Sequence, residues 1–419
     1  MNSHFYDPAF TLCSEKMPFT IRIEVNLKEA VDGASLRRAV EEGRRRYPHF
    51  AMRVVREGED YLTKANDLPF VVRKGDAIPP LGGEEVNFHL FAVVYGEKTI
   101  HFLTSHVITD GGGFFPFLKH ILCAYFSFRA GRNLSVPGVS FSDPPLGVEA
   151  TAFPFPEEKL EQVTPLFVPK KKEFFRLGEG GLLTDSIPTV YRLRVPEKDI
   201  LRFSHDNDGS PCALLSSLTA KAIRRLHPEE TRDIVCAVSV NLRPVFGCPM
   251  NFRMLSSSLA VTYPKKLTDA DITKCCTCTR GMITLRNQPE NILWEAAERK
   301  KLIESLSSLS LAEKKAILGK RALEDATDNT FSVSYVGKND LGEMEPYLDS
   351  IYNMTDASTK GAVFLEVMAV GGWFDVAFLQ GFSSDVYYRA FCGQLTENGL
   401  TYLEEHSSPI DTPAILLPS

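Results

Sequence analysis

Residues 99–126, TIHFLTSHVITDGGGFFPFLKHILCAYF, constrain the fold more than any other segment, because a strand pattern changes there into a helix pattern. Up to His106, successive residues alternate between two faces, as they do in a β-strand. Apolar residues then recur at the three- and four-residue spacings of a buried helical face: Phe114, Phe117, Leu118, Ile121, Leu122 and Tyr125. The segment therefore predicts a strand and a helix joined by one short loop.

The loop contains His106, Asp110 and three glycines that begin at Gly111. Histidine titrates near neutral pH, so an imidazole at a strand end could be the general base that takes a proton from an attacking hydroxyl or amine. Asp110 could orient this imidazole, or it could anchor the loop through an arginine. A purely structural interpretation is also open, in which His106 closes the strand and Asp110 caps the helix.

Several segments together resemble the chloramphenicol acetyltransferase-like superfamily of CoA-dependent acyltransferases, and most of all its bacterial alcohol O-acetyltransferase-like group. They are HVITDGGGFFPFLKHIL with its HxxxDG motif, SVNLRP at Ser239–Pro244, NF at Asn251–Phe252 and SVSYVGKND at Ser332–Asp340. Their order and intervals are similar to those of the family, over nearly the whole chain. Many members have two histidines where this chain has Ser105 and His106, and the second is the family's base. The DFGWG signature of the plant BAHD branch is absent, which argues against that branch.

The resemblance implies an α/β (α+β) fold of two similar lobes, each a mixed sheet flanked by helices, with a tunnel at their interface. Residues 1–180 would form the N-terminal lobe with the HxxxDG motif, and residues 181–419 the C-terminal lobe. The proline-rich, weakly periodic segment 133–188 is the expected crossover between them.

The resemblance also assigns roles to residues of the active site. His106 would be the general base, reached by a CoA thioester from one end of the tunnel and by the acyl acceptor from the other. Asp110, the second residue of the catalytic motif, would be structural rather than a relay, beside Gly111, and would pair with Arg243 across the lobe interface. In related enzymes, a ring nitrogen of the imidazole bonds to its own backbone carbonyl.

The developing oxyanion needs a hydrogen-bond donor. Asn251 and Ser256 are the nearest polar candidates for this role or for substrate binding, and a loop amide and hydroxyl with internal partners fit the sequence equally well. Lys170, Lys171 and Lys172 could dock the phosphates of CoA, although a solvated charge run is the simpler interpretation.

We therefore expect an acyltransferase that moves an acetyl or other acyl group from acyl-CoA, its co-substrate, to a small-molecule alcohol or amine. Two alternatives stay open. One is a condensation-domain-like enzyme whose acyl donor rides an acyl carrier protein supplied in trans, and the other is a non-catalytic binder with the same fold. Acceptor identity, acyl chain length, CoA contacts and oligomeric state have no signal in the sequence.

Charge and hydropathy exclude several other classes of protein. The net charge of −6 gives no basic footprint for nucleic acid. No apolar stretch follows a basic region at the start, so we expect no secretory signal and a cytoplasmic protein. The longest apolar region, residues 362–382, is interrupted by Glu366, by Gly371 and Gly372, and by Asp375, which predicts a hairpin and no transmembrane segment.

Cysteine spacing gives no sign of a metal site. The nine cysteines form no paired framework, and the CCTC cluster of Cys275, Cys276 and Cys278 lacks a fourth ligand and zinc-like spacing. We expect reduced thiols and no metal.

Periodicity predicts the remaining elements. The expected strands are 21–27, 50–54, 86–94, 189–195, 234–240, 257–263 and 330–336, and the expected helices are 32–47, one from Ser210-Pro211 to Leu226, two across 269–319, and a closing helix from about Ser384.

Overall fold

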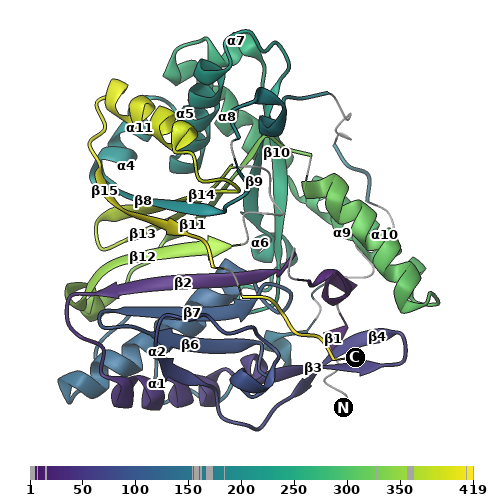
Figure 1. Ribbon diagram of the computed structural model, residues 1–419, viewed down its shortest axis with the longest axis vertical. Coiled ribbons are helices and arrows are strands. Elements are labelled where there is room, and N and C mark those ends of the chain that lie inside the picture. Colours follow the sequence, from purple (N-terminus) through teal and green to yellow (C-terminus); the bar gives the residue numbers. More distant parts are fainter. Residues whose placement is uncertain are drawn as a thin grey trace.

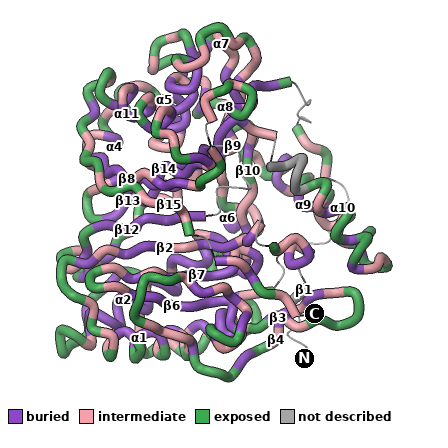
Figure 2. The backbone as a smooth tube through the Cα atoms, viewed as in Figure 1, coloured by how far each residue is buried: buried purple, intermediate pink, exposed green. Residues whose placement is uncertain are grey.

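Two β-sheets, each with helices over one face, organise the protein (Figure 1). The computed structural model describes residues 5–418 apart from 7, 15–16, 153, 155–159, 161–162, 167–172, 184, 327, 356–362 and 412. Buried residues follow the strands of both sheets (Figure 2). The expected mixed α/β architecture of two sheet-and-helix lobes is confirmed.

The N-terminal sheet has the strand order β12-β2-β7-β6-β5, and helices α1 and α2 cover it. Its elements are β2 (Thr20–Leu27), α1 (Gly33–Arg46), β5 (Val72–Lys74), β6 (Phe91–Tyr95), β7 (Thr99–Ser105), α2 (Gly111–Ala130) and β12 (Leu348–Thr355). Asp32 caps α1 by accepting a hydrogen bond from the Ala34 amide at 2.9 Å. The predicted strand, loop and helix of residues 99–126 are confirmed as β7, the motif loop and α2.

The C-terminal sheet has seven strands in the order β10-β9-β11-β13-β14-β8-β15. Its strands are β8 (Thr189–Pro196), β9 (Ile234–Asn241), β10 (Ser256–Tyr263), β11 (Phe331–Lys338), β13 (Val363–Val370), β14 (Trp373–Gln380) and β15 (Leu403–Pro409). Helices α4 (Glu197–Asp206), α5 (Pro211–Leu226), α8 (Ile272–Arg286) and α11 (Val386–Glu397) pack on one face, and α6 (Arg243–Phe246) and α7 (Lys265–Thr268) are single turns. Ser210 caps α5 and Pro211 occupies its first turn, as the sequence predicts.

A pair of helices ties the second half of the chain to a small third sheet. The sheet consists of β1 (Phe5–Tyr6), β3 (Met52–Glu57) and β4 (Asp60–Ala65), and the helices are α9 (Pro289–Leu306) and α10 (Leu311–Ala326). Both helices lie at the right of Figure 1, above this sheet. The Leu311 amide donates to Glu59 Oε2 at 2.6 Å, and the buried Lys314 ammonium pairs with Asp60.

Strand β12 is the seam between the two sheets. It pairs antiparallel with β2, with Ile351 opposite Val25, so residues 348–355 belong to the N-terminal sheet although they follow residue 180. The face of the C-terminal sheet away from its helices packs on β12 through Val190, Tyr352, Met354, Phe364, Ala377 and Leu379. A buried ion pair, Arg192 Nη2 to Glu24 Oε2 at 2.9 Å, crosses the same seam. The lobes are thus not two consecutive pieces of sequence, and the exact boundary stays a prediction.

Several predicted elements differ from the structure. Three helices, not two, cover residues 272–326, because Ser310 and Glu313 form a reciprocal cap that starts α10 anew. The strand predicted over 86–94 is confined to β6, since Asn87 and Phe88 adopt left-handed backbone conformations, with φ of 53° and 62°. Helix α11 is followed by strand β15 and is not the last element. The connecting 3-10 helices are η1 (Pro8–Leu12), η2 (Pro48–Phe50), η3 (Glu84–Val86), η4 (Val148–Ala150), η5 (Leu177–Gly180) and η6 (Gly342–Tyr347).

Candidate active site

His106 lies directly after the last residue of β7 and lines a cleft. Its backbone amide donates to the carbonyl of Phe19 at 2.6 Å, and Phe19 adopts a φ of 47°, a strained conformation for an aromatic residue. Its ring Nδ1 lies 3.0 Å from the carbonyl oxygen of Thr109. Because a carbonyl can only accept, Nδ1 carries the proton in this arrangement and the basic lone pair is on Nε2. The ring is therefore oriented by the backbone carbonyl of Thr109. The family resemblance had implied a bond to the backbone carbonyl of His106 itself, so this detail differs from the expectation.

The Asp110 carboxylate is fully occupied by the fold. Oδ1 accepts from the Gly113 amide at 2.8 Å and from Arg243 Nη2 at 2.7 Å, and Oδ2 accepts from Arg243 Nη1 at 3.0 Å and the Leu255 amide at 2.7 Å. Asp110 thus caps α2 and anchors the loop through an arginine, which were separate possibilities at the sequence level. With four donors on two oxygens, it is a structural residue and not an orienter of His106.

Arg243, the predicted partner, is 5% exposed and joins the motif loop to the loop after β9. In addition to the bidentate contact with Asp110, Nε donates to the Asn251 carbonyl at 2.6 Å and Nη2 to the Arg253 carbonyl at 2.7 Å. Nη1 also donates to Asn241 Oδ1 at 3.2 Å. Only a planar guanidinium reaches this many fixed acceptors, so a lysine could not replace it.

The glycines of the motif allow the loop of residues 251–255 to lie against the start of α2. A Cβ on Gly113 would collide with the Phe252 carbonyl oxygen, to which Thr109 Oγ1 also donates at 2.7 Å. A Cβ on Gly112 would lie 2.9 Å from Arg243 Nη1. The backbone conformation of these two glycines would allow a side chain, but the space for a Cβ is already filled by neighbouring atoms. Glycine is therefore needed here because other parts of the chain approach the backbone closely.

The cleft at His106 has a volume of about 450 Å³ and is lined from both sheets. This volume is within the range of small-molecule sites. Its walls include Phe19, Ile21, His106, Asp110, Gly111, Ser239, Asn241, Arg243, Met254, Ser256, Ser257, Ser258, Ser334, Tyr335, Val336, Asn353, Thr355 and Glu366. His106, Asp110, Gly111, Arg243 and Ser256 are therefore brought together as expected. The expected tunnel, open to the CoA thioester at one end and to the acyl acceptor at the other, stays a prediction.

Asn251 does not reach the cleft, and its assignment as an oxyanion donor is wrong. Its Nδ2 donates to the Ala152 carbonyl at 2.7 Å and its Oδ1 accepts from the Arg253 amide at 3.1 Å, so both ends of the amide hold the loop. Ser256, the first residue of β10, does line the cleft. Tyr335 lines it as well, and because burial raises its pKa to about 12, its phenol stays protonated near neutral pH and is no candidate for the base.

The sequence analysis assigned several cleft residues no role in the site, among them Glu366 of β13 and, from β12, Asn353 and Thr355. Glu366 is 2% exposed; its Oε2 accepts from Asn353 Nδ2 at 2.9 Å and its Oε1 from Thr355 Oγ1 at 2.9 Å. In the sequence, Glu366 is a lone carboxylate within the apolar run FLEVMAV, and this was the signal that could have marked it.

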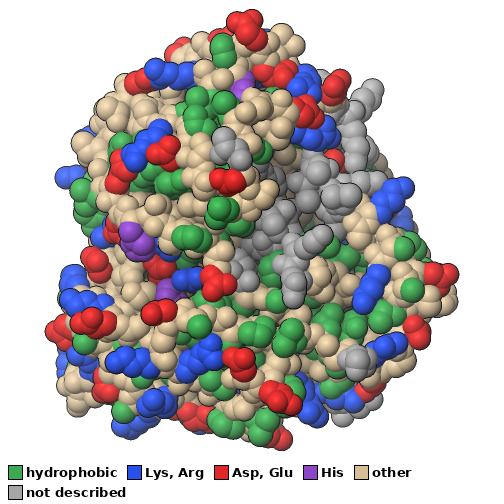
Figure 3. All heavy atoms as spheres, viewed as in Figure 1, with side chains coloured by type: hydrophobic (Ala, Val, Ile, Leu, Met, Phe, Trp, Pro, Cys, Tyr) green, Lys and Arg blue, Asp and Glu red, His purple; other side chains and the backbone are tan. Residues whose placement is uncertain are grey.

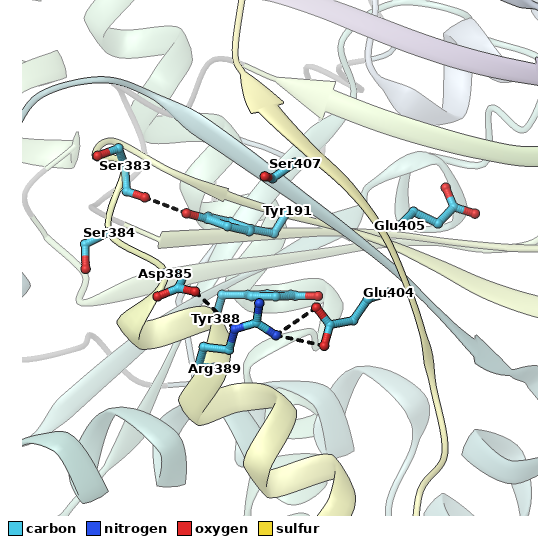
Figure 4. Close-up of a pocket in the computed structure, with 9 residues that line it drawn as sticks. All are labelled: Tyr191, Ser383, Ser384, Asp385, Tyr388, Arg389, Glu404, Glu405 and Ser407. Atoms are coloured by element: carbon cyan, nitrogen blue, oxygen red, sulfur yellow. Dashed lines mark hydrogen bonds and ion pairs between the residues drawn. The ribbon is translucent and has the colours of Figure 1, made fainter.

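A second cavity, of about 430 Å³, lies at the far side of the C-terminal lobe, between β8, α11 and β15 (Figure 4). The rings of Tyr191 and Tyr388 stack there with centroids 4.7 Å apart. Arg389 is held by Asp385 at 3.0 Å and Glu404 at 2.8 Å. Because these charges already satisfy one another and no motif residue takes part, we assign this cavity no role in the chemistry.

The remaining predictions concern thiols, metals, membranes and CoA docking. All nine cysteines are free, and burial raises the pKa of Cys276 to about 12. Within the described ranges, no group of three or more His, Cys, Asp or Glu could hold a metal ion. No helix of the described chain is both long enough and apolar enough to cross a bilayer. On the face shown in Figure 3, acidic and basic side chains are interspersed. Lys170, Lys171 and Lys172 lie outside the described residues.

No protein-family model and no curated protein matches the sequence. Solved structures match its fold. TRI101 of Fusarium sporotrichioides, complexed with coenzyme A and T-2, superposes with a TM-score of 0.61 at 9% identity, over 96% of this chain and 100% of that one. TRI3 trichothecene 15-O-acetyltransferase from the same organism gives 0.59 at 9%, over 94% of both chains. The first condensation domain of the CDA synthetase gives 0.56 at 12%, over 91% of both.

The chain therefore has the two-lobed fold of these acetyltransferases and condensation domains, as the sequence led us to expect. At these identities the similarity defines the fold, and the chemistry has to be argued from the cleft itself.

Proposed function

We propose that this protein is a CoA-dependent acyltransferase of the alcohol O-acetyltransferase-like kind, acting in the cytoplasm on a small-molecule hydroxyl or amine with His106 as general base. One observation carries the proposal: the imidazole of His106 lines a cleft of about 450 Å³ between the two lobes, with Nδ1 on a carbonyl and Nε2 as the basic nitrogen. The same fold in a protein complexed with coenzyme A and in a 15-O-acetyltransferase supports it.

In this mechanism, His106 Nε2 takes the proton of the acceptor's hydroxyl or amine as that group attacks the thioester carbonyl. The carbon–sulfur bond then breaks, and the imidazolium returns its proton to the departing CoA thiolate. The hydroxyl of Ser256, on the opposite lobe, is the candidate donor to the oxyanion. Asp110 and Arg243 act indirectly, because their ion pair fixes the loop that follows His106.

A carrier-bound acyl donor is the second candidate, since condensation domains share this fold. A carrier thioester would present the same carbonyl to His106, so the two donors differ only in what lies beyond the sulfur. A non-catalytic binder is the remaining alternative, and the intact His106 is the observation against it.

The deciding experiment is a thiol-release screen of acetyl-CoA and longer acyl-CoA donors against a panel of alcohols and amines, with His106→Ala as the matched control. Release that depends on both acceptor and His106 supports the proposal. A thermal shift with acyl-CoA but no release under any acceptor supports the binder. Transfer only from an acylated carrier protein supports the condensation-like enzyme.

A further inference from the structure

The peptide group between Thr109 and Asp110 contains the carbonyl that orients His106. His106 Nδ1 lies 3.0 Å from this carbonyl oxygen, which belongs to Thr109. Because a carbonyl only accepts, the bond forms only while the proton of the neutral ring is on Nδ1. In the other tautomer the proton is on Nε2, which then has no lone pair for the proton of an acyl acceptor. The position of this one oxygen therefore controls how often the ring has the tautomer that a base at Nε2 needs.

Both ends of this peptide group are anchored to the loop of residues 251–255, which leads into β10 of the C-terminal lobe. At one end, Thr109 Oγ1 donates to the Phe252 carbonyl at 2.7 Å. At the other end, the Asp110 carboxylate accepts from the Leu255 amide at 2.7 Å. A loop of one lobe thus fixes a peptide group of the other lobe, next to the candidate base.

The threonine side chain is well suited to transmit this contact to its own backbone. Thr109 is 0% exposed, so water does not compete for its hydroxyl. Its single hydroxyl proton is used in the contact with Phe252, because the distance to the Asp110 carbonyl is longer, at 3.3 Å. A branched Cβ restricts rotation about χ1, so a fixed hydroxyl also fixes the orientation of the backbone that carries it.

From these contacts we infer that Thr109 is a positioning residue for the general base. Its hydroxyl, bound to Phe252, fixes the carbonyl that keeps the proton of His106 on Nδ1, so a contact between the lobes sets the tautomer of the base. Thr109 acts through His106 and not on the reacting atoms. The catalytic meaning of this inference rests on the proposed function, whereas the tautomer is a property of the ring that is measured without a substrate.

The first test is nuclear magnetic resonance of the ring nitrogens in protein made with isotope-labelled histidine, at a pH where the ring of His106 is neutral. Protonated and unprotonated ring nitrogens have different shifts, and the signals of His106 are those missing from His106→Ala. The wild type should have a protonated Nδ1 and an unprotonated Nε2. Thr109→Val keeps the shape of the side chain and removes the hydroxyl, so both nitrogens should move to intermediate shifts, and Thr109→Ser should restore the wild-type shifts. A wild-type ring with its proton on Nε2, or unchanged shifts in Thr109→Val, overturns the inference.

Thr104→Val is the matched control for the loss of a buried hydroxyl. Thr104 is 0% exposed, and its hydroxyl donates to the Leu90 carbonyl at 3.3 Å, within the N-terminal lobe. It lies in β7, two residues before His106, and is not among the described residues that line the cleft. The shifts of His106 should stay as in the wild type. A change as large as in Thr109→Val would show that any loosening near the motif moves the ring, and it overturns the inference.

Thiol release from acyl-CoA separates this inference from the proposed function. The loss of one hydrogen bond predicts that kcat falls by about 2- to 10-fold in Thr109→Val, with a smaller change in KM, and that Thr109→Ser recovers it. A changed tautomer in Thr109→Val, together with no release by the wild type under any acceptor, supports the positioning of the ring and contradicts the transferase. Release that is equal in Thr109→Val and the wild type supports the transferase and overturns the inference.

Discussion

Arg243 Nη2 lies 2.7 Å from Asp110 Oδ1, and this contact joins residues 133 positions apart in the chain. Their side chains are 6% and 4% exposed, so both charges have lost most of their hydration. Such a buried pair is stable only when its remaining donors and acceptors are also satisfied. The amides of Gly113 and Leu255 donate to Asp110. Arg243 donates to three further acceptors, the side-chain oxygen of Asn241 and the carbonyls of Asn251 and Arg253. The contact therefore holds the motif loop of one lobe on the β9–β10 loop of the other.

Replacement of Asp110 by alanine should destabilise the protein, because it leaves a buried guanidinium without its counter-ion. We expect the free energy of unfolding to fall by about 3–5 kcal/mol, measured by denaturant titration. In the double variant Asp110→Asn, Arg243→Met, neither charge is left alone, and part of the lost stability should return. If Asp110→Ala melted like the wild type but had no activity, Asp110 would be a catalytic carboxylate instead.

His106→Ala should give a folded protein with little transferase activity. The residue is only half-buried and lines the cleft, so we expect a melting temperature near that of the wild type. Loss of a general base should lower the rate of acyl transfer by about 10²–10⁴-fold in a thiol-release assay. Unchanged turnover in this variant would remove His106 from the mechanism.

The glycines of the motif should differ sharply in their tolerance of a methyl group. In Gly113→Ala, the new Cβ would overlap the backbone carbonyl of Phe252. This carbonyl cannot move away unless the hydrogen bonds from Arg243 to the neighbouring carbonyls are broken. In Gly111→Ala, the nearest atom is Val336 Cγ2 at 3.4 Å, an ordinary contact. We expect Gly113→Ala to lower the free energy of unfolding by at least about 1–3 kcal/mol, and Gly111→Ala to have a much smaller effect. Similar losses in the two variants would show that the Phe252 approach is not the constraint.

Local sequence predicted which helices and strands form the site, but it did not predict which residues from distant parts of the chain lie beside them. The β7–loop–α2 unit is specified within one segment, where the period of apolar residues changes from two to about three and a half and the turn residues lie between. The Asp110–Arg243 contact was available only through the family resemblance, because no local pattern connects two charges so far apart in the chain. Asn251 had the right residue type and position in the sequence, but its amide is consumed by Ala152 and Arg253.

The seam strand shows why the rest of the site was out of reach. Strand β12 lies at the edge of a sheet whose other strands all precede residue 106, and no periodicity can specify such a long-range pairing. Asn353 and Thr355 reach the cleft only through this pairing, and Glu366 follows on the next strand. The side of the cleft that β12 and β13 form therefore depends on the long-range topology, whereas the position of His106 depends on local sequence.

His49 makes stability depend on pH, in a direction that follows from its burial. Both ring nitrogens are buried with no hydrogen-bond partner among the described residues, the ring lies 4.6 Å from that of Phe50 and 5.2 Å from that of Phe252, and burial lowers its pKa to about 3. Below pH 6.5 the unfolded chain gains a proton at His49, and the folded protein does not until about pH 3. The contribution of His49 to folding stability is therefore complete above pH 6.5 and is lost as the pH falls through this window. The loss is on the order of 1 kcal/mol per pH unit.

His49→Phe keeps the ring packing and removes this proton, so the fall in unfolding free energy between about pH 7 and pH 5 should be smaller than in the wild type. His205→Ala, at an exposed histidine, should retain the wild-type fall, and an equally steep fall in His49→Phe would show that His49 is not the group that titrates.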